Sequence, residues 1–463
     1  MSRYLPRRDA LMTALLGAGY VGLRALATGL PASLLLDPRR ALASGLGEGG
    51  QDEGAEAGEV GEGADGAAPM CAAAKAQYII FNTSGSGDPL NVSVPGTYGV
   101  AGVFHCPDPT MAQTNLTLQG QTYAAAAPWA TLPQSVLDRT SFWHIMTDTP
   151  VHPKEPDVLK LMDATLGNEM LPSILAKQLA SCLGTLQSQP LSIGATSPSE
   201  TITYGGRALA TIPPTALKAI LTSPDGSLGK LQSLRAQTLD QLYPLYKNDA
   251  TPAQQAFIDA MVTSQSQARG ISQNLLSQLS SIADNTATSQ IVAALALIQM
   301  KVAPVIAVHI PFGGDNHFDA ALQDEATQTV AGVATIASLM SQLEAAGLAD
   351  QVTFLSLNVF GRTLASNANS GINGRQHNPN HQASIAIGRG FKGGVVGGIA
   401  PIQGDFGAVA FDSSTGQPSA SGDVTALASL GAFGQTVLAA VGVDATVAAQ
   451  QIDRGKVVTG ALA

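Results

Sequence analysis

Charged and aromatic side chains are both scarce in this sequence of 463 residues. Charged residues make up 13% of the chain and aromatic residues 5%, whereas hydrophobic residues make up 45%. The formal net charge is -10, and no stripe of lysine and arginine follows residue 43. Because phosphate binding needs clustered Lys and Arg, the composition argues against nucleic acid as a partner. The apolar content is enough to bury a sizeable core.

A long uncharged hydrophobic run is also missing. A transmembrane helix needs about 20 mostly apolar residues. The longest mildly apolar segment, near the N-terminus, is interrupted by Arg24. We therefore expect no stable membrane insertion.

The N-terminal residues have the features of an export signal. Arg7 and Arg8 precede the mildly apolar segment, and the small residues Ala41–Ala43 follow it as a cleavage site. Paired arginines are typical of the twin-arginine (Tat) pathway, so we predict a Tat-type signal peptide at residues 1–43 that is recognised by the Tat export machinery. The usual Phe after the arginines is missing, which leaves Sec export as the alternative. Either pathway predicts a periplasmic or extracellular protein.

Cysteine is rare, and the segment after the signal is poor in apolar residues. Residues 44–70 are rich in Gly, Glu and Ala and contain no aromatic residue, which predicts a disordered linker. The three cysteines form no CxxC pattern. In an oxidising compartment, Cys71 and Cys106 are the pair that we expect, because both flank the first strand region, and Cys182 is left over.

The remaining chain alternates between strand-like and helix-like patterns. Apolar runs predict buried strands near residues 76–84, 140–148, 191–195, 302–308, 351–358 and 384–398. Helical periodicity occupies about 213–302, 325–347 and 423–443. This alternation predicts an α/β domain at 71–463 with a mostly parallel sheet between helices, including a helical insertion at about 213–302.

Polar residues gather directly after several predicted strands. Carboxyl ends of parallel strands converge on one edge of a sheet, so such residues can share a site. The candidates are Asp88; His144, Asp148 and His152; Asp315 and His317; and Arg362, His377 and His381. Asp and neutral His together suit Zn, Mn or Fe, while all-oxygen sets suit Mg or Ca. The alternative is a set of polar loops in which these side chains only bond the backbone.

Five short motifs in order resemble domain-of-unknown-function family 1501, a group of exported proteins placed in the alkaline phosphatase/sulfatase-like superfamily. The motifs are "GSGDPLNVSVP" at 85–95, "GGDNH" at 313–317, "NVFGRT" at 358–363, "GRQHN" at 374–378 and "GRGFKGGVVGG" at 388–398. The resemblance implies an alkaline-phosphatase-like sheet with a site for a divalent metal such as Zn, Mn or Mg. By position it implies Asp88, Asp315, His317 and His377 as metal ligands.

The same resemblance suggests residues that would contact a substrate. Arg362 can hold a phosphate or sulfate through a bidentate contact. His152 stands where the family tends to carry a loop histidine, and His381 is a further candidate. The superfamily's nucleophile has no clear counterpart, because Thr83, Ser84 and Ser86 stand in no distinctive motif, so the catalytic residue is unknown.

Departures from the family pattern reduce the expected site. Val359 stands where the family has Glu, and Gln376 stands where it has Asp. Losing anionic ligands weakens a divalent site, so we expect one metal ion rather than two. Two functions follow as hypotheses. The first is a degenerate metal site that works by binding a cell-envelope ligand or a protein partner. The second is a metal-dependent hydrolase of a phosphate or sulfate ester.

Overall fold

The computed structural model describes residues 71–221, 273–365 and 374–463, together with residues 241, 243–245, 247, 248 and 255. The predicted signal peptide, the predicted linker and about half of the predicted helical insertion lie outside these residues.

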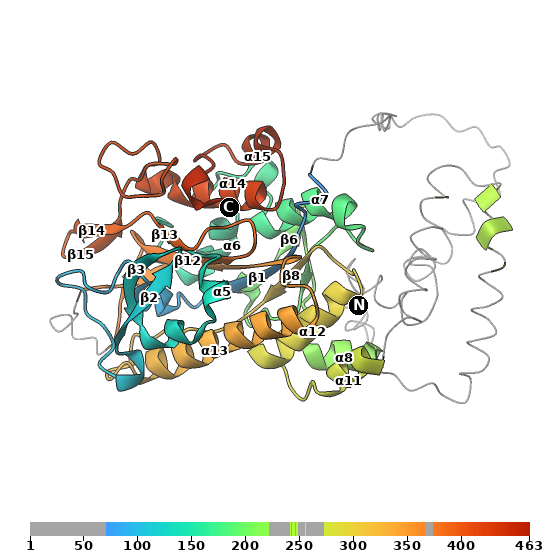
Figure 1. Ribbon diagram of the computed structural model, residues 1–463, viewed down its shortest axis with the longest axis horizontal. Coiled ribbons are helices and arrows are strands. Elements are labelled where there is room, and N and C mark those ends of the chain that lie inside the picture. The colour runs from blue at the N-terminus through green and yellow to red at the C-terminus, as the bar shows by residue number, and fades with distance from the viewer. Residues whose placement is uncertain are drawn as a thin grey trace, which may run out of the picture.

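A seven-stranded sheet forms the centre of the described chain (Figure 1). Only β12 runs antiparallel to its neighbours; the other strands share one direction. The α/β class with a mostly parallel sheet is therefore confirmed, while the alkaline-phosphatase-like assignment stays a prediction. In spatial order the strands are β13 (Gly394–Val396), β4 (Thr140–Ile145), β12 (Gln382–Ile387), β9 (Val352–Asn358), β1 (Tyr78–Ser84), β8 (Val305–Val308) and β5 (Leu191–Ser192).

Both faces of the sheet are buried, and each face has its own core. Along β1, Ile79 and Phe81 point into one core while Tyr78 and Ile80 point into the other. Successive side chains of a strand alternate between faces, so a strand buried on both sides reads as a continuous apolar run. This is why the sequence pattern identified β1, β8 and β9.

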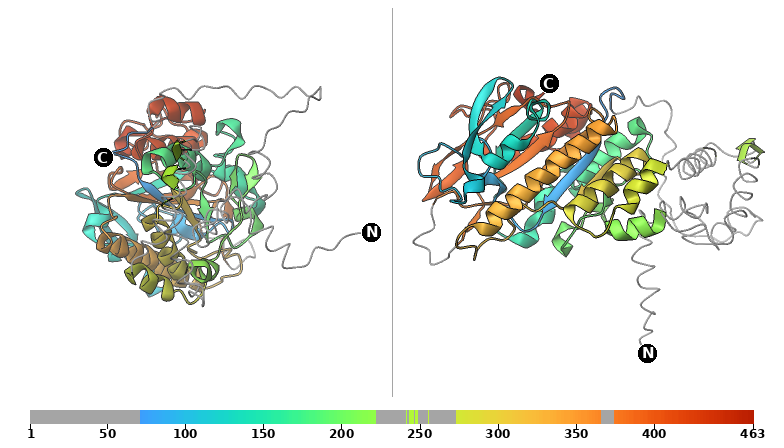
Figure 2. Two further views of the ribbon diagram at one scale, coloured as in Figure 1. Left: turned by 90° about the vertical axis from the view of Figure 1, so that its right-hand side faces the viewer. Right: turned by 60° about the horizontal axis from the view of Figure 1, so that its bottom comes forward.

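Helices cover both faces (Figures 1 and 2). One face is covered by α8 (Pro214–Leu221), α11 (Gln273–Ser280), α12 (Ala287–Gln299) and the long α13 (Gln323–Ala345). The other face is covered by α6 (Glu155–Leu159), α7 (Leu171–Leu183), α14 (Ser429–Ala440) and α15 (Ala445–Gln451). Among the helices of the described ranges, none has the length and apolar character needed to cross a bilayer.

The expected pairing of Cys71 with Cys106 is wrong. Cys71 is bonded to Cys182, with 6.5 Å between the Cα atoms, and Cys106 is a buried free cysteine. The sheet separates the two candidates, because Cys71 belongs to the core under α7 and α14 whereas Cys106 belongs to the core under α13. Cys182 lies near the end of α7, on the same face as Cys71. Closeness in sequence to the first strand carried no information about the face.

One edge of the sheet collects the polar loops. The parallel strands β4, β9, β1 and β8 end there, and the antiparallel β12 begins there. A small hairpin at this edge pairs β10 (Gly361–Arg362) with β11 (His377–Asn378), so Arg362 stands opposite His377. The fold thereby brings together segments that are far apart in the sequence.

Candidate metal centre

Four side chains at this edge form a compact cluster: His152, Asp315, His317 and His377. Each offers one ligand atom, and these atoms all lie within 4.8 Å of one another. His152 follows β4, Asp315 and His317 follow β8, and His377 lies in β11 just before β12. Three imidazoles and one carboxylate at this spacing could hold a metal ion.

The contacts inside the cluster are short. Nε2 of His317 lies 2.7 Å from Nε2 of His377. The two carboxylate oxygens of Asp315 lie 3.4 Å from Nε2 of His317 and 3.4 Å from Nε2 of His152. The Asp315 side chain is 48% exposed and that of His152 is 31% exposed, so the cluster is open to solvent on one side.

Backbone carbonyls orient two of the imidazoles. Nδ1 of His152 donates to the carbonyl of Gly85 at 2.8 Å, and Nδ1 of His377 donates to the carbonyl of Pro150 at 2.5 Å. In a neutral imidazole, a proton on Nδ1 leaves a lone pair on Nε2. Both Nε2 atoms therefore face the cluster as acceptors, the orientation that metal-binding histidines adopt.

The third imidazole, His317, has two neighbours at its Nε2 atom. Nη1 of Arg362 lies 3.4 Å away, and a guanidinium can only donate. Nε2 of His377 lies 2.7 Å away, close enough for His317 to donate to it. With its proton on Nδ1 instead, His317 would present a second lone pair beside that of His377, and a cation between the two would remove their repulsion.

The protonation states agree with this assignment. Burial, and after it the charge of Arg362, lowers the pKa of His377 to about 4 and also lowers the pKa of His317. Burial acts to raise the pKa of Asp315, but its hydrogen bond to Arg362 and the charge of Arg362 hold that pKa below its ordinary value. At neutral pH His317 and His377 therefore present neutral imidazole nitrogens and Asp315 an ionised carboxylate, which are the forms that bind metal.

Arg362 contacts the cluster through Asp315. Its side chain is completely buried, and Nη2 donates to Asp315 at 2.8 Å and to the carbonyl of Ser86 at 2.7 Å, while Nε donates to the carbonyl of Gly87 at 2.5 Å. Phe360 lies against the guanidinium, 5.4 Å from ring centre to Cζ. In this arrangement Arg362 holds the loop after β1 and Asp315, and its donors are already in use.

Asp88 lies outside the cluster. Its carboxylate is buried, accepts from the backbone N–H of Gly314 at 2.8 Å, and keeps one oxygen without a partner. Burial raises the pKa of Asp88, although His309 and Arg362 oppose that shift. The contact ties the loop after β1 to the loop that carries Asp315 and His317.

His381 also lies outside the cluster, in a second histidine group. It is fully buried, and its Nε2 lies 2.8 Å from Nδ1 of His144, while Asn91 donates to its Nδ1 at 3.2 Å. Nε2 of His144 donates in turn to the carbonyl of Pro95 at 2.8 Å. The neighbouring Gly96 has φ +96°, and a Cβ atom there would lie 2.3 Å from the His144 ring. We name this group, His144 and His381, the buried histidine pair.

One supporting residue, Phe360, was not among the predicted site residues. Phe360 is fully buried, and its ring centre lies 4.2 Å from that of His377 and 4.9 Å from that of His152. Gly87, with φ +62°, allows this packing, because a Cβ atom there would lie 2.0 Å from the Phe360 ring. Phe360 stands inside the "NVFGRT" motif, which was the available signal.

Fold and site together define an α/β protein with a His/Asp cluster at the carboxyl edge of its sheet. Residues 223–446 match the family described as "Protein of unknown function (DUF1501)". The match includes Asp315, His317, Arg362 and His377, and it supports the domain family that the motifs suggested. His152 precedes the matched segment. No curated protein matches the chain.

Proposed function

We propose that this protein holds one divalent transition-metal ion of the zinc type at His152, Asp315, His317 and His377. In this proposal the metal-loaded protein binds a cell-envelope ligand or a protein partner and catalyses no reaction. The observation that carries the proposal is the convergence of the four ligand atoms within 4.8 Å of one another, with the Nε2 atoms of His317 and His377 2.7 Å apart. The pair is consistent with a cation between the two rings.

The donor set favours zinc over magnesium. Three imidazole nitrogens and one carboxylate oxygen match the tetrahedral sites of Zn²⁺, whereas Mg²⁺ prefers six oxygens. Val359 and Gln376 stand where the resembling family has acidic residues, and the described residues contain one group of His and Asp whose ligand atoms converge closely enough to hold an ion. When bound, the ion would supply a fixed positive charge and Lewis acidity at the open side of the cluster.

Two features favour binding over hydrolysis. Structural zinc sites use four protein ligands, whereas catalytic sites keep one position for water or substrate. The other feature concerns the three candidate nucleophiles: Thr83 and Ser84 are buried, the Thr83 hydroxyl donates to Glu155, and only Ser86 is partly exposed. Arg362, the expected anion clamp, uses the donors of Nε and Nη2 on Asp315 and on backbone carbonyls, and its Nη1 faces His317.

A metal-dependent phosphate or sulfate ester hydrolase is the second candidate. The exposed Asp315 carboxylate, 48% accessible, favours it, because a ligand that swings away leaves an open coordination position. The resemblance to the alkaline phosphatase/sulfatase-like superfamily supports the same chemistry, and the meeting of the "GGDNH", "NVFGRT" and "GRQHN" motifs at one sheet edge is consistent with it.

Metal analysis of the purified full chain tests the proposal. We expect about one Zn²⁺ per chain by mass spectrometry after loading and removal of excess metal, and none in His317→Ala. His105→Ala is the matched control, because His105 stacks on Tyr98 and lies outside the cluster. Absence of stoichiometric metal after loading with Zn or Mn would sink the metal proposal. Metal-dependent turnover of an aryl phosphate or sulfate, lost in His317→Ala, would favour the hydrolase instead.

We further propose that the protein is exported to the periplasm or beyond. Support comes from the Cys71–Cys182 disulfide, because structural disulfides persist in oxidising compartments. The sequence support is the Arg7–Arg8 pair and the small residues at 41–43. Fractionation of cells that express the full chain should find it outside the cytoplasm, and replacing Arg7 and Arg8 by Lys should keep it inside. Equal distributions would contradict Tat export.

A further inference from the structure

A buried ion pair lies behind the metal cluster. Nε of Arg375 donates to one oxygen of Glu325 at 2.6 Å, and Nη2 of Arg375 donates to the other oxygen at 3.0 Å. The two side chains are 2% and 1% exposed. This is a bidentate guanidinium–carboxylate contact with almost no access to water, the strongest geometry for such a pair.

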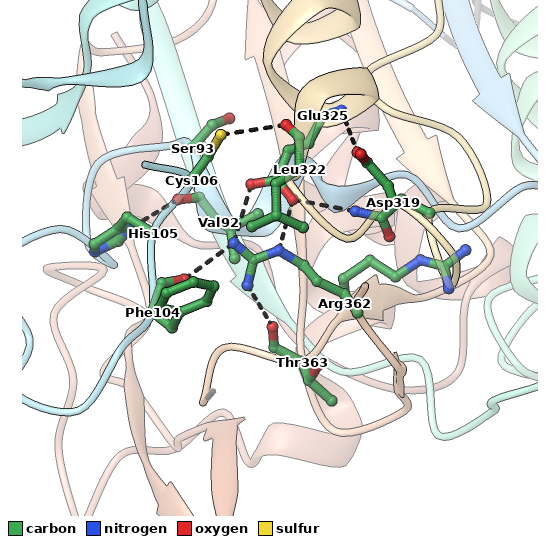
Figure 3. A network of polar contacts seen from close by, with 12 residues as sticks. Val92, Ser93, Phe104, His105, Cys106, Asp319, Leu322, Glu325, Arg362 and Thr363 are labelled. Atoms are coloured by element: carbon green, nitrogen blue, oxygen red, sulfur yellow. Dashed lines mark hydrogen bonds and ion pairs between the residues drawn. The ribbon is translucent and has the colours of Figure 1, made fainter. Parts of the chain in front are cut away.

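Each partner is fixed by further contacts, and Figure 3 labels Glu325, Asp319, Thr363 and Phe104 in this network. Glu325 lies in the first turn of α13, which Asp319 caps by accepting from the N–H groups of Gln323 at 2.7 Å and Glu325 at 3.0 Å. The remaining donors of Arg375 reach the carbonyls of Thr363 at 2.9 Å and Phe104 at 3.0 Å. The pair is therefore anchored to four segments of the chain.

The pair connects the two loops that supply the facing histidines. Arg375 precedes His377 by two positions, and Asn316 stands between Asp315 and His317. Nδ2 of Asn316 donates to Glu325 at 3.1 Å. Glu325 thus receives hydrogen bonds from both loops.

Backbone contacts run along the same junction. The N–H of Gly374 donates to the carbonyl of His317 at 2.9 Å, and the N–H of Arg375 donates to the carbonyl of Asn316 at 3.3 Å. These two bonds hold the loops side by side, and the side chains of Glu325, Arg375 and Asn316 lock that arrangement from behind.

Stability alone is a weak reason for such a pair. Removing two charges from water costs free energy that their attraction often fails to repay, and apolar replacements are often as stable. Metal ligands, in contrast, must be held within a few tenths of an ångström of their positions. A role in holding the metal ligands in position explains why the chain buries this ion pair, whereas a contribution to stability alone does not.

We propose that Glu325, Arg375 and Asn316 form a positioning clamp that sets the distance between His317 and His377. The proposal rests on the metal site proposed above and assigns it three supporting residues that contact no metal. Partners behind metal ligands typically affect affinity by about 10- to 100-fold. The clamp predicts a loss of that size without loss of the ligands themselves.

Asn316→Ala is the first test, because it removes one contact and leaves the ion pair intact. We expect the Kd for Zn²⁺, measured by competition with a chelator, to rise roughly tenfold. Ile336→Val is the control: Ile336 is fully buried in α13, eleven positions from Glu325, and the change lowers stability without touching either loop. An unchanged Kd in Asn316→Ala, or an equal rise in Ile336→Val, would overturn the clamp.

A double replacement separates positioning from stability. Glu325→Gln leaves the Arg375 charge buried without its partner and should lower the Tm strongly. Glu325→Met combined with Arg375→Met removes both charges and should recover much of the Tm, while the Kd for Zn²⁺ stays raised. Recovery of Tm and Kd together would show that the pair acts through stability alone, and the proposal would fall.

Amide hydrogen exchange tests the positioning clamp even if the wild type binds no metal. In Asn316→Ala the N–H groups of Gly374 and Arg375 should exchange roughly tenfold faster than in the wild type. In Ile336→Val the exchange rates of these two N–H groups should change no more than those of neighbouring amides. Unchanged exchange at both positions refutes the clamp, and absent metal with faster exchange refutes only the metal site.

Discussion

Two groups of histidines lie at the same edge of the sheet and differ in almost every physical property. The buried histidine pair, His144 and His381, is closed to solvent, whereas His152, His317 and His377 are partly accessible and share a carboxylate. His377 and His381 are only four positions apart. Residue type and sequence neighbourhood therefore do not decide which histidine can bind an ion.

The hydrogen-bond partners of the ring nitrogens explain the difference between the two groups. In the buried pair, Asn91 donates to His381, His381 donates to His144, and His144 donates to the carbonyl of Pro95, so each ring nitrogen has a complementary partner. In the cluster, the Nε2 atoms of all three rings face inward, and those of His152 and His377 are acceptors because their Nδ1 atoms donate to carbonyls. A chain of satisfied bonds is a structural element, while converging acceptors are a site for a cation.

The largest effect that separates the two groups is on metal affinity. Zinc held by four protein ligands is bound by roughly 10–16 kcal/mol, so the loss of one ligand costs on the order of 4 kcal/mol, roughly a thousandfold in Kd. We expect this loss in His377→Ala, measured by chelator competition with Zn²⁺. His381→Ala should bind Zn²⁺ within a few-fold of the wild type.

For stability the order of the two variants should be reversed, with the larger loss in the buried histidine pair. His381→Ala removes one hydrogen-bond partner from each of Asn91 and His144 in a buried site, while Asn91 keeps its bond to the carbonyl of Arg362 and His144 keeps its bond to the carbonyl of Pro95. The free energy of unfolding should fall by about 2 kcal/mol. His377→Ala, at a partly exposed position, should change it by less than about 1 kcal/mol. If both variants lost metal and stability in parallel, the distinction between the groups would be wrong.

Acid should also act on the buried histidine pair. Burial lowers the pKa of His144 to about 4 and lowers that of His381 further below its ordinary value, because the buried rings resist charge. The unfolded chain binds protons near pH 6.5, so it takes up more protons than the folded chain below that pH. Stability is therefore full above about pH 6.5 and falls as the pH drops toward 4, by on the order of 3 kcal/mol for His144.

Denaturant unfolding at several pH values, with a chelator present, measures this dependence. His144→Gln keeps an amide that can donate to Pro95 and removes the titrating ring, so its stability should fall less between pH 6.5 and 4. The same slope in the variant and the wild type would show that the buried histidine pair does not limit acid stability.

The hydrophobic pattern of the sequence was enough to predict the central strands and the class of fold. The apolar runs that became β1, β8 and β9 are continuous because helices cover both faces of the sheet, and the polar residues after them lie at one edge because these strands are parallel. Asp315, His317 and His377 were nominated on that argument, and the structure brings them together. Asp88 was nominated on the same argument and lies behind the loop as a brace.

Other choices depended on contacts between distant segments. His381 stands directly before β12, whose antiparallel register on β4 pairs Ala383 with His144, and this draws His381 into the core beside His144. His152, expected to contact substrate, belongs to the cluster because β4 lies next to β12 in the sheet. No spacing rule in the sequence contains that neighbour relation.

The sequence by itself determined the class of fold, the strand cores and a short set of polar candidates, because hydrophobic periodicity and strand ends are local properties. Only the tertiary structure decided which histidines face one another, which cysteine bonds Cys71, and how Glu325 reaches Arg375. Those outcomes depend on strand order, on the face of the sheet and on register. Each is a distance between segments that the chain brings together only when its core closes.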